Sequence, residues 1–151
     1  MILTGAAIAA CSPQAPASPA LDNGAQTALQ TVPLTIRSAT GEHRFTVEVA
    51  RSPEEQRAGL MFRRSLAGDR GMIFPYDSPQ EVAFWMKNTL IPLDMIFIRA
   101  DGTIARIAAN TVPLSLQPVP AGEPVAAVLE LRGGRAAELG IQPGDRVEWT
   151  R

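Results

Sequence analysis

Three features of the sequence predict a mainly β protein (a β-rich α+β fold), in the form of a compact, partly open barrel or sandwich of short strands with two short helices. Short apolar runs alternate with polar residues, turn-forming residues recur roughly every 8–12 positions, and only two stretches carry helix signals. The chain has 151 residues, of which 46% are hydrophobic and 19% are charged. That is enough for one domain with its own hydrophobic core.

The first predicted elements are a β-hairpin and a helix. Apolar and polar residues alternate over Leu34–Ile36 and again over Phe45–Val49, on either side of a turn at Gly41, which is typical of a hairpin with one buried face. The stretch Ser52–Glu55 then combines an N-cap serine, a proline suited to the first helical position and a capping-box glutamate. It predicts a helix from Pro53 to Leu60.

Four short strands are predicted in the middle of the chain, each bounded by proline, glycine or aspartate. They are Gly71–Tyr76, Val82–Met86, Asp94–Arg99 and Thr103–Ala108. We expect the first strand to end at Pro75 and the third strand to begin only after Pro92, because proline has no N–H to donate to a neighbouring strand. Asp101-Gly102 between the last two strands predicts a two-residue hairpin turn.

The last predicted elements are a strand, a short helix and a closing strand. Pro124–Leu131 is apolar except for Glu130, Arg135–Leu139 is a helix that Gly140 stops, and Arg146–Trp149 closes the domain. The predicted organisation is therefore one domain over residues 31–151.

The amino-terminal 30 residues read as an export signal and a tether. Ile8-Ala9-Ala10-Cys11 resembles the lipobox of bacterial lipoproteins, in which the cysteine is lipidated, so residues 1–11 are expected to be a signal segment. The positively charged start of such signals is missing, and a longer leader would restore it. Residues 12–30 are rich in Pro, Ala, Ser and Gln, as in a flexible linker. We expect an exported protein, in the periplasm or at the outer membrane, anchored by lipid on Cys11.

Composition argues against several classes of function. The net charge of −1 gives no general attraction to nucleic acid, and no apolar run approaches the ~20 residues that span a bilayer. Cys11 is the only cysteine and His43, beside a turn, is the only histidine. The sequence thus shows neither a Ser-His-Asp set nor a His/Cys metal site, and we expect no cofactor and no metal. The expected partners are a small molecule or an envelope protein, with the membrane reached only through the lipid anchor.

A series of short motifs resembles one family, the domain of unknown function 192 family. The motifs are Arg57–Met61, Gly71–Phe74, Phe84–Thr89, Pro92–Asp94, Leu129–Leu131, Gly140-Ile141 and Gly144-Asp145, in the family's order. The resemblance covers about Arg51 to Trp149, and the Trp-Met-Lys-Asn-Thr block followed by Pro-Leu-Asp is its most specific part. It implies a small β-rich domain, often exported in bacteria, and no established reaction, substrate or cofactor.

The candidate site consists of polar residues set in otherwise apolar segments: Trp85, Lys87, Asn88, Asp94 and Glu130. Polar groups that converge on an aromatic wall are typical of small-ligand sites, and Arg57 or Arg63 would add selectivity for anions. The same residues could instead form a structural network, in which Lys87 pairs with Asp94 or Glu130, since burying them unpaired is costly.

Two further functions stay open at the level of sequence. Asp94 and Glu130 could form a carboxylate pair with hydrolase-like activity, provided that they lie within ~10 Å of each other. Residues 134–147 also look like the helix–turn–strand of PDZ modules, which bind a peptide as an added strand. Binding of a small ligand or an envelope partner, without catalysis, is the preferred prediction.

Overall fold

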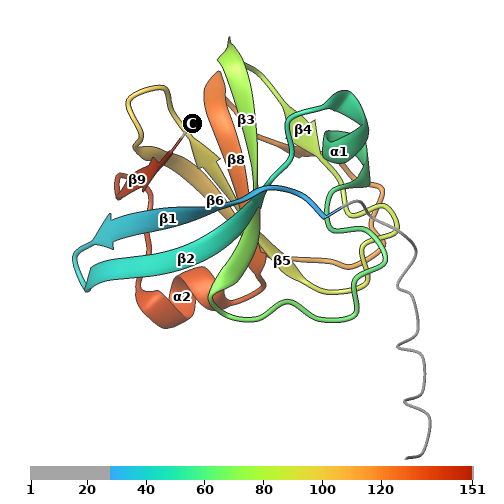
Figure 1. Ribbon diagram of the computed structural model, residues 1–151, viewed down its shortest axis with the longest axis horizontal. Coiled ribbons are helices and arrows are strands. Elements are labelled where there is room, and N and C mark those ends of the chain that lie inside the picture. Colours follow the sequence, from blue (N-terminus) through green and yellow to red (C-terminus); the bar gives the residue numbers. More distant parts are fainter. Residues whose placement is uncertain (1–27, 151) are drawn as a thin grey trace, which may run out of the picture.

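The computed structural model describes residues 28–150 and shows one strongly curled sheet with two short helices (Figure 1). Cys11, the signal segment and most of the expected linker lie outside the described residues. The strands of the main sheet are β1 (Thr31–Ser38), β2 (Gly41–Val49), β3 (Arg70–Gln80), β5 (Leu93–Ile98), β6 (Ile104–Thr111), β8 (Val125–Arg132) and β9 (Arg146–Trp149). The helices are α1 (Pro53–Ala58) and α2 (Arg135–Leu139). The predicted mainly β fold with two short helices is confirmed.

The main sheet runs in the order β6-β5-β8-β3-β2-β1-β9 and forms a half-barrel. All neighbours pair antiparallel except β2 and β3, which are parallel and connected through α1. The two outer strands meet at one corner, where Thr103 bridges Arg146 and the Val147 amide donates to the Gly102 carbonyl at 2.8 Å. β6 and β9 are otherwise not paired with each other. The barrel is therefore partly open, as predicted.

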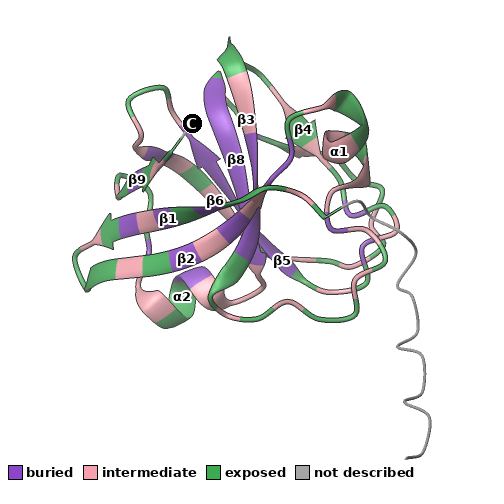
Figure 2. Ribbon diagram, viewed as in Figure 1, coloured by how far each residue is buried: buried purple, intermediate pink, exposed green. Residues whose placement is uncertain are grey.

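The sheet buries a separate hydrophobic cluster on each face, and Figure 2 shows the buried residues concentrated where β3, β8 and β5 cross the middle of the molecule. The first cluster is covered by β1, β2, β9 and α2 and includes Leu34, Ile36, Val47, Ile96, Leu129 and Val147. The second lies on the other face, against α1 and the loops, and includes Leu60, Met72, Phe74, Met95, Phe97 and Val128. Along β5 successive residues alternate between the clusters, as the pleat requires.

The predicted α1 cap is confirmed in detail. The Ser52 hydroxyl accepts from the Glu55 amide at 3.2 Å, and the Glu55 carboxylate accepts from the Ser52 amide at 2.8 Å. These two bonds satisfy amides that the first helical turn leaves free. The helix ends at Ala58 rather than Leu60, because Gly59 (φ 46) leaves the helical conformation.

Three predicted strand details are wrong. Pro75 does not end β3, because β2 stops pairing at Ile73 and the proline lies where β3 has only one neighbour. The predicted strand Val82–Met86 shortens to β4 (Ala83–Phe84) and pairs outside the main sheet with β7 (Val119–Pro120). The β5–β6 turn has a three-residue loop, closed by a bond from the Arg99 amide to the Thr103 carbonyl, with Gly102 at φ 86.

Candidate functional site

Glu130 is a buried carboxyl group on the second-cluster face of β8. Its residue is 4% exposed, and its register partners on the neighbouring strands are Met72 and Met95. Among the described residues no group donates a hydrogen bond to its carboxyl oxygens, and burial raises the pKa of this carboxyl to about 8. At pH 7 Glu130 is therefore mostly protonated, and its O–H is a free donor.

Gly71 allows β3 to approach β8 at this position. A Cβ on Gly71 would lie 2.5 Å from the Glu130 carbonyl oxygen and 2.8 Å from Leu131 Cδ2. Only glycine tolerates such a close approach of two backbones. The Gly-Met-Ile-Phe motif thus fixes the strand next to Glu130.

A pocket of about 370 Å³ opens above Glu130. Its aromatic walls are Phe74, Tyr76 and Phe84, with Trp85 nearer the mouth. The Phe74 and Phe84 rings meet edge to face, with centroids 5.1 Å apart, an arrangement that aromatic pairs favour. The remaining lining comes chiefly from α1 and the loop that follows it: Gln56, Arg57, Ala58, Gly59, Leu60 and Met61.

Two polar side chains accompany Glu130 in the pocket. Burial, and in second place the nearby Glu130 carboxyl, raise the pKa of the Tyr76 hydroxyl to about 12, so Tyr76 keeps its proton. Thr89 is buried, and its hydroxyl donates to the Lys87 carbonyl at 3.2 Å. The pocket therefore presents hydroxyl and carboxyl groups within an aromatic wall.

Asp94 lies on the opposite face of the sheet and has a structural role. It is fully buried, and its Oδ1 accepts from the amides of Asn110 at 2.8 Å and Gly134 at 2.9 Å. Its Oδ2 accepts from the Ala136 amide at 2.8 Å. Gly134 has no side chain to cap α2, so Asp94 supplies the cap from a neighbouring strand.

The acid–base pair considered from the sequence does not form. Glu130 is paired in register with Met95, the residue after Asp94, so the two carboxyl groups point to opposite faces of the sheet. Asp94 bonds to the amides around α2, whereas Glu130 faces the pocket. A hydrolase mechanism that uses both residues has no geometric basis.

The remaining predicted site residues are divided between the pocket rim and other parts of the surface. Lys87 pairs with neither carboxylate: it is exposed, and its Nζ lies 5.1 Å from the centre of the Trp85 ring. Asn88 shapes the loop at φ 54, with its carbonyl accepting from the Phe62 amide at 2.8 Å. The structure thus brings Trp85, Lys87 and Asn88 together beside the pocket.

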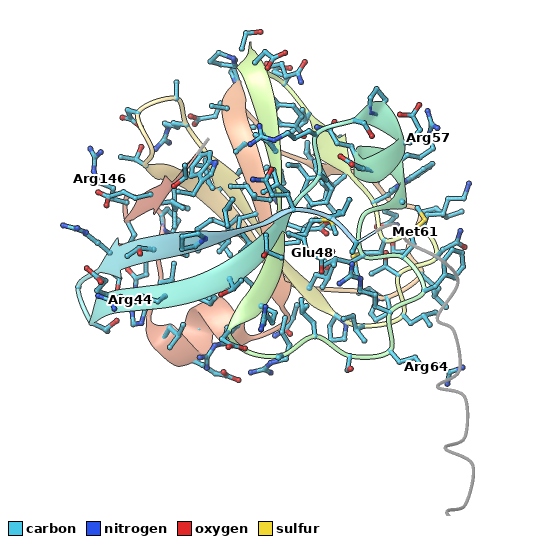
Figure 3. The ribbon with its side chains drawn as sticks, in the orientation of Figure 1. Arg44, Glu48, Arg57, Met61, Arg64 and Arg146 are labelled. Carbon is cyan, nitrogen blue, oxygen red and sulfur yellow. The ribbon has the colours of Figure 1, made fainter. Side chains whose placement is uncertain are left out.

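The two predicted arginines have different surroundings. Arg57 is exposed at the pocket rim. Arg63 binds Glu48 through two bonds, of 2.6 and 2.7 Å, in the bidentate geometry that guanidinium and carboxylate favour. Figure 3 shows Arg57 and Met61 at the same end of the molecule. Arg63 is therefore a structural residue, and Arg57 belongs to the candidate site.

Sequence reasoning missed Phe74, Tyr76 and Thr89 as pocket residues. These residues come from β3 and a loop, and the only local signal was the apolar run before Pro75. Among residues 28–150 no group of three or more His, Cys, Asp or Glu side chains is placed to hold a metal ion. Within the same residues, no helix is long and apolar enough to cross a membrane.

Comparisons with known proteins identify the family. The model of the domain of unknown function 192, described as "Uncharacterized ACR", matches residues 35–149. A crystal structure from Novosphingobium aromaticivorans, of a protein of unknown function, is 50% identical and has a TM-score of 0.80 over 88% of this chain and 94% of that one.

A second structure comes from Sinorhizobium meliloti, of a protein to which transcription regulation has been ascribed. It is 44% identical, with a TM-score of 0.80 over 83% of this chain and 98% of that one. No curated protein matches the chain. The chain belongs to the domain of unknown function 192 family, as the sequence motifs indicated.

Proposed function

We propose that this member of the family is an exported, lipid-anchored protein that binds a small ligand in the Glu130 pocket. The observation that carries the proposal is a largely buried glutamate whose carboxyl group has no hydrogen-bond partner among the described residues and opens onto an aromatic pocket. Removing a carboxyl group from bulk water without giving it a protein partner destabilises a fold, and such groups persist mainly where function needs them.

The size and chemistry of the pocket support a small amphipathic ligand. A volume of about 370 Å³ falls within the range of small-molecule sites. The ligand's apolar part would pack against Phe74, Phe84 and Trp85. Its polar group would accept the Glu130 proton and donate to the second carboxyl oxygen, as an amide does.

Export and anchoring rest on the lipobox-like motif that ends at Cys11 and on the Pro/Ala/Ser-rich segment after it. Cys11→Ser in the producing cell would test them. We expect the parent protein to carry a lipid and to stay with membranes that are washed at high salt, and the variant to carry no lipid and to be released by the wash. A parent chain that stays in the cytoplasm would contradict this part of the proposal.

The alternative of a PDZ-like peptide site has no observation in its favour. The segment that suggested it forms α2 and β9, and β9 pairs with β1 within the main sheet. The role ascribed to the S. meliloti relative is likewise not carried over, because no basic strand or helix face points to nucleic acid among the described residues.

Thermal unfolding with a panel of small amides, carboxylic acids, alcohols and amines tests ligand binding. A compound that binds the native state raises the unfolding midpoint in proportion to its concentration relative to Kd. We expect such a compound to stabilise the parent chain and the exposed control Glu148→Gln, but not Glu130→Gln or Phe84→Ala. If every stabilising compound acts equally on all four proteins, the pocket is not the site.

A further inference from the structure

Three loops form one end of the molecule, which we call the loop face: residues 59–68, 85–92 and 112–118. Backbone bonds hold them together, from the Phe62 amide to the Asn88 carbonyl at 2.8 Å and from the Leu114 amide to the Thr89 carbonyl at 3.1 Å. A third bond, at 2.9 Å, joins the Met86 amide to the Ser115 carbonyl. The loops are therefore parts of one surface.

The loop face carries all six large hydrophobic side chains that are exposed among residues 28–150. They are Phe62, Trp85, Leu90, Val112, Leu114 and Leu116, with exposed fractions from 43% to 69%. Single exposed apolar residues are ordinary on protein surfaces, but a cluster of this kind marks an interaction site.

Two of these side chains are held in a strained backbone conformation. Phe62 has φ 64 and Leu114 has φ 63, in the left-handed region that bulky residues rarely adopt. Glycine or asparagine would adopt the same left-handed backbone conformation with less steric strain. Bulky apolar residues in such positions indicate that the exposed side chains themselves are needed.

The charge of the loop face is of one sign. Its three loops contain Arg63, Arg64 and Lys87 and no aspartate or glutamate; Arg57 lies just before the first loop and Asp69 just after it. Arg63 binds Glu48, but among the described residues Arg57, Arg64 and Lys87 form no ion pair. Figure 3 shows Arg57, Met61 and Arg64 at the end opposite Arg44 and Arg146.

We infer that the loop face is a docking surface for an anionic lipid bilayer. Apolar side chains inserted between headgroups, surrounded by basic residues that bind lipid phosphates, are the composition of interfacial membrane surfaces. Trp85 and Lys87 suit this arrangement, because tryptophan favours the interface and a neighbouring lysine reaches the headgroups. The inference does not depend on the proposed ligand.

Other partners fit the loop face less well. The centres of protein interfaces are depleted of lysine, whereas Lys87 lies over Trp85 among the apolar side chains. Duplex DNA would leave the exposed leucines in contact with water or phosphate. The charge and the apolar tips together therefore favour a membrane surface that carries negative lipids.

Sedimentation with lipid vesicles tests the inference. The protein is the full chain with Cys11→Ser, which removes the predicted anchor, and the vesicles are phosphatidylglycerol with phosphatidylcholine, or phosphatidylcholine alone. Each basic residue near an anionic surface strengthens binding about fivefold. We expect Arg64→Glu with Lys87→Glu to weaken binding to anionic vesicles by at least about 25-fold, and the matched pair Arg44→Glu with Arg146→Glu to leave it nearly unchanged.

Fluorescence locates the contact, because the chain has two tryptophans, Trp85 on the loop face and Trp149 on β9. Trp149→Phe leaves only Trp85, and Trp85→Phe leaves only Trp149. With brominated acyl chains in the vesicles, we expect quenching of Trp85 and little quenching of Trp149.

A third comparison separates binding from folding. Phe62→Asn with Leu114→Asn removes two apolar tips while suiting the left-handed backbone, so we expect weaker vesicle binding at an unchanged or higher unfolding midpoint. The inference is overturned if the chain binds vesicles of neither composition or if the fluorescence of Trp85 is not quenched. It is also overturned if both charge-reversal pairs behave alike, or if the loop face instead retains duplex DNA or a purified envelope protein.

Discussion

Replacing Glu130 with glutamine should stabilise the protein above neutral pH and flatten its stability profile. The pKa of this carboxyl is raised from 4.5 in the unfolded chain to about 8 in the folded one. Between these values the folded state keeps a proton that the unfolded state releases, so the free energy of unfolding falls as pH rises, and below about pH 4.5 this effect vanishes.

The magnitude follows from the width of that window. Each pH unit within it favours unfolding by about tenfold, so the whole window corresponds to roughly 5 kcal/mol, of which roughly 3 kcal/mol has been lost by pH 7. The glutamine side chain has a similar shape but does not titrate. The difference in stability between Glu130→Gln and the parent should therefore grow steadily from pH 5 to pH 8.

Among the described residues, the other groups with shifted pKa values titrate outside this window. Hydrogen bonds lower the pKa values of Glu55, Asp101, Glu123 and Glu138, so the stability they add is present above their unfolded pKa values near 4 and is lost as the solution becomes more acidic. The pKa of Tyr76 is raised from 10 to about 12, so its contribution falls only above pH 10. Neither effect reaches the range from pH 5 to pH 8.

Urea unfolding at pH 5, 6, 7 and 8, followed by tryptophan fluorescence, measures the effect. Glu148→Gln, an exposed carboxylate on β9, serves as the control and should run parallel to the parent. If the Glu130→Gln profile also runs parallel to the parent, Glu130 is charged in the folded state. The argument from burial would then be wrong.

Three further predictions concern the frame around the site, each measured by urea unfolding. Asp94→Ala should cost roughly 3–5 kcal/mol, because three backbone amides lose their acceptor; a loss below 1 kcal/mol would contradict its capping role. Gly71→Ala should cost at least about 2 kcal/mol, because its Cβ would overlap the Glu130 carbonyl, and an unchanged midpoint would refute that overlap. Leu114→Asn should raise the free energy of unfolding by up to about 1 kcal/mol, because it relieves the strain of a leucine in the left-handed conformation. A decrease would show that packing of the Leu114 side chain stabilises the fold.

Local signals in the sequence predicted most of the fold. Each of these signals depends on neighbours within a few residues: the capping box at Ser52–Glu55, the alternation along β1 and β2, and the start of β5 after Pro92. The errors arose where pairing with a distant segment decides the structure. Pro75 is tolerated in β3 because β2 has already stopped pairing, and β4 finds a partner 35 positions later, at Val119–Pro120.

The candidate site was harder to predict because the central strands are buried on both faces. β5 and β8 read as continuous apolar runs, so the sequence gives no alternation to show which face each residue takes. Asp94 and Glu130 were therefore grouped, although the β5–β8 register separates them. Trp85, Lys87 and Asn88 lie near one another because they are close together in the chain.

The two buried carboxyl groups differ in what surrounds them, and this difference decides which one marks a site. Asp94 accepts hydrogen bonds from three amides, so its burial stabilises the turn into α2. Glu130 has no such donors among the described residues, and its burial destabilises the fold at pH 7. A methionine at position 130 would pack against Met72 and Met95 without that cost. The glutamate at this position therefore supports the proposed ligand site, in which the bound group would use its proton.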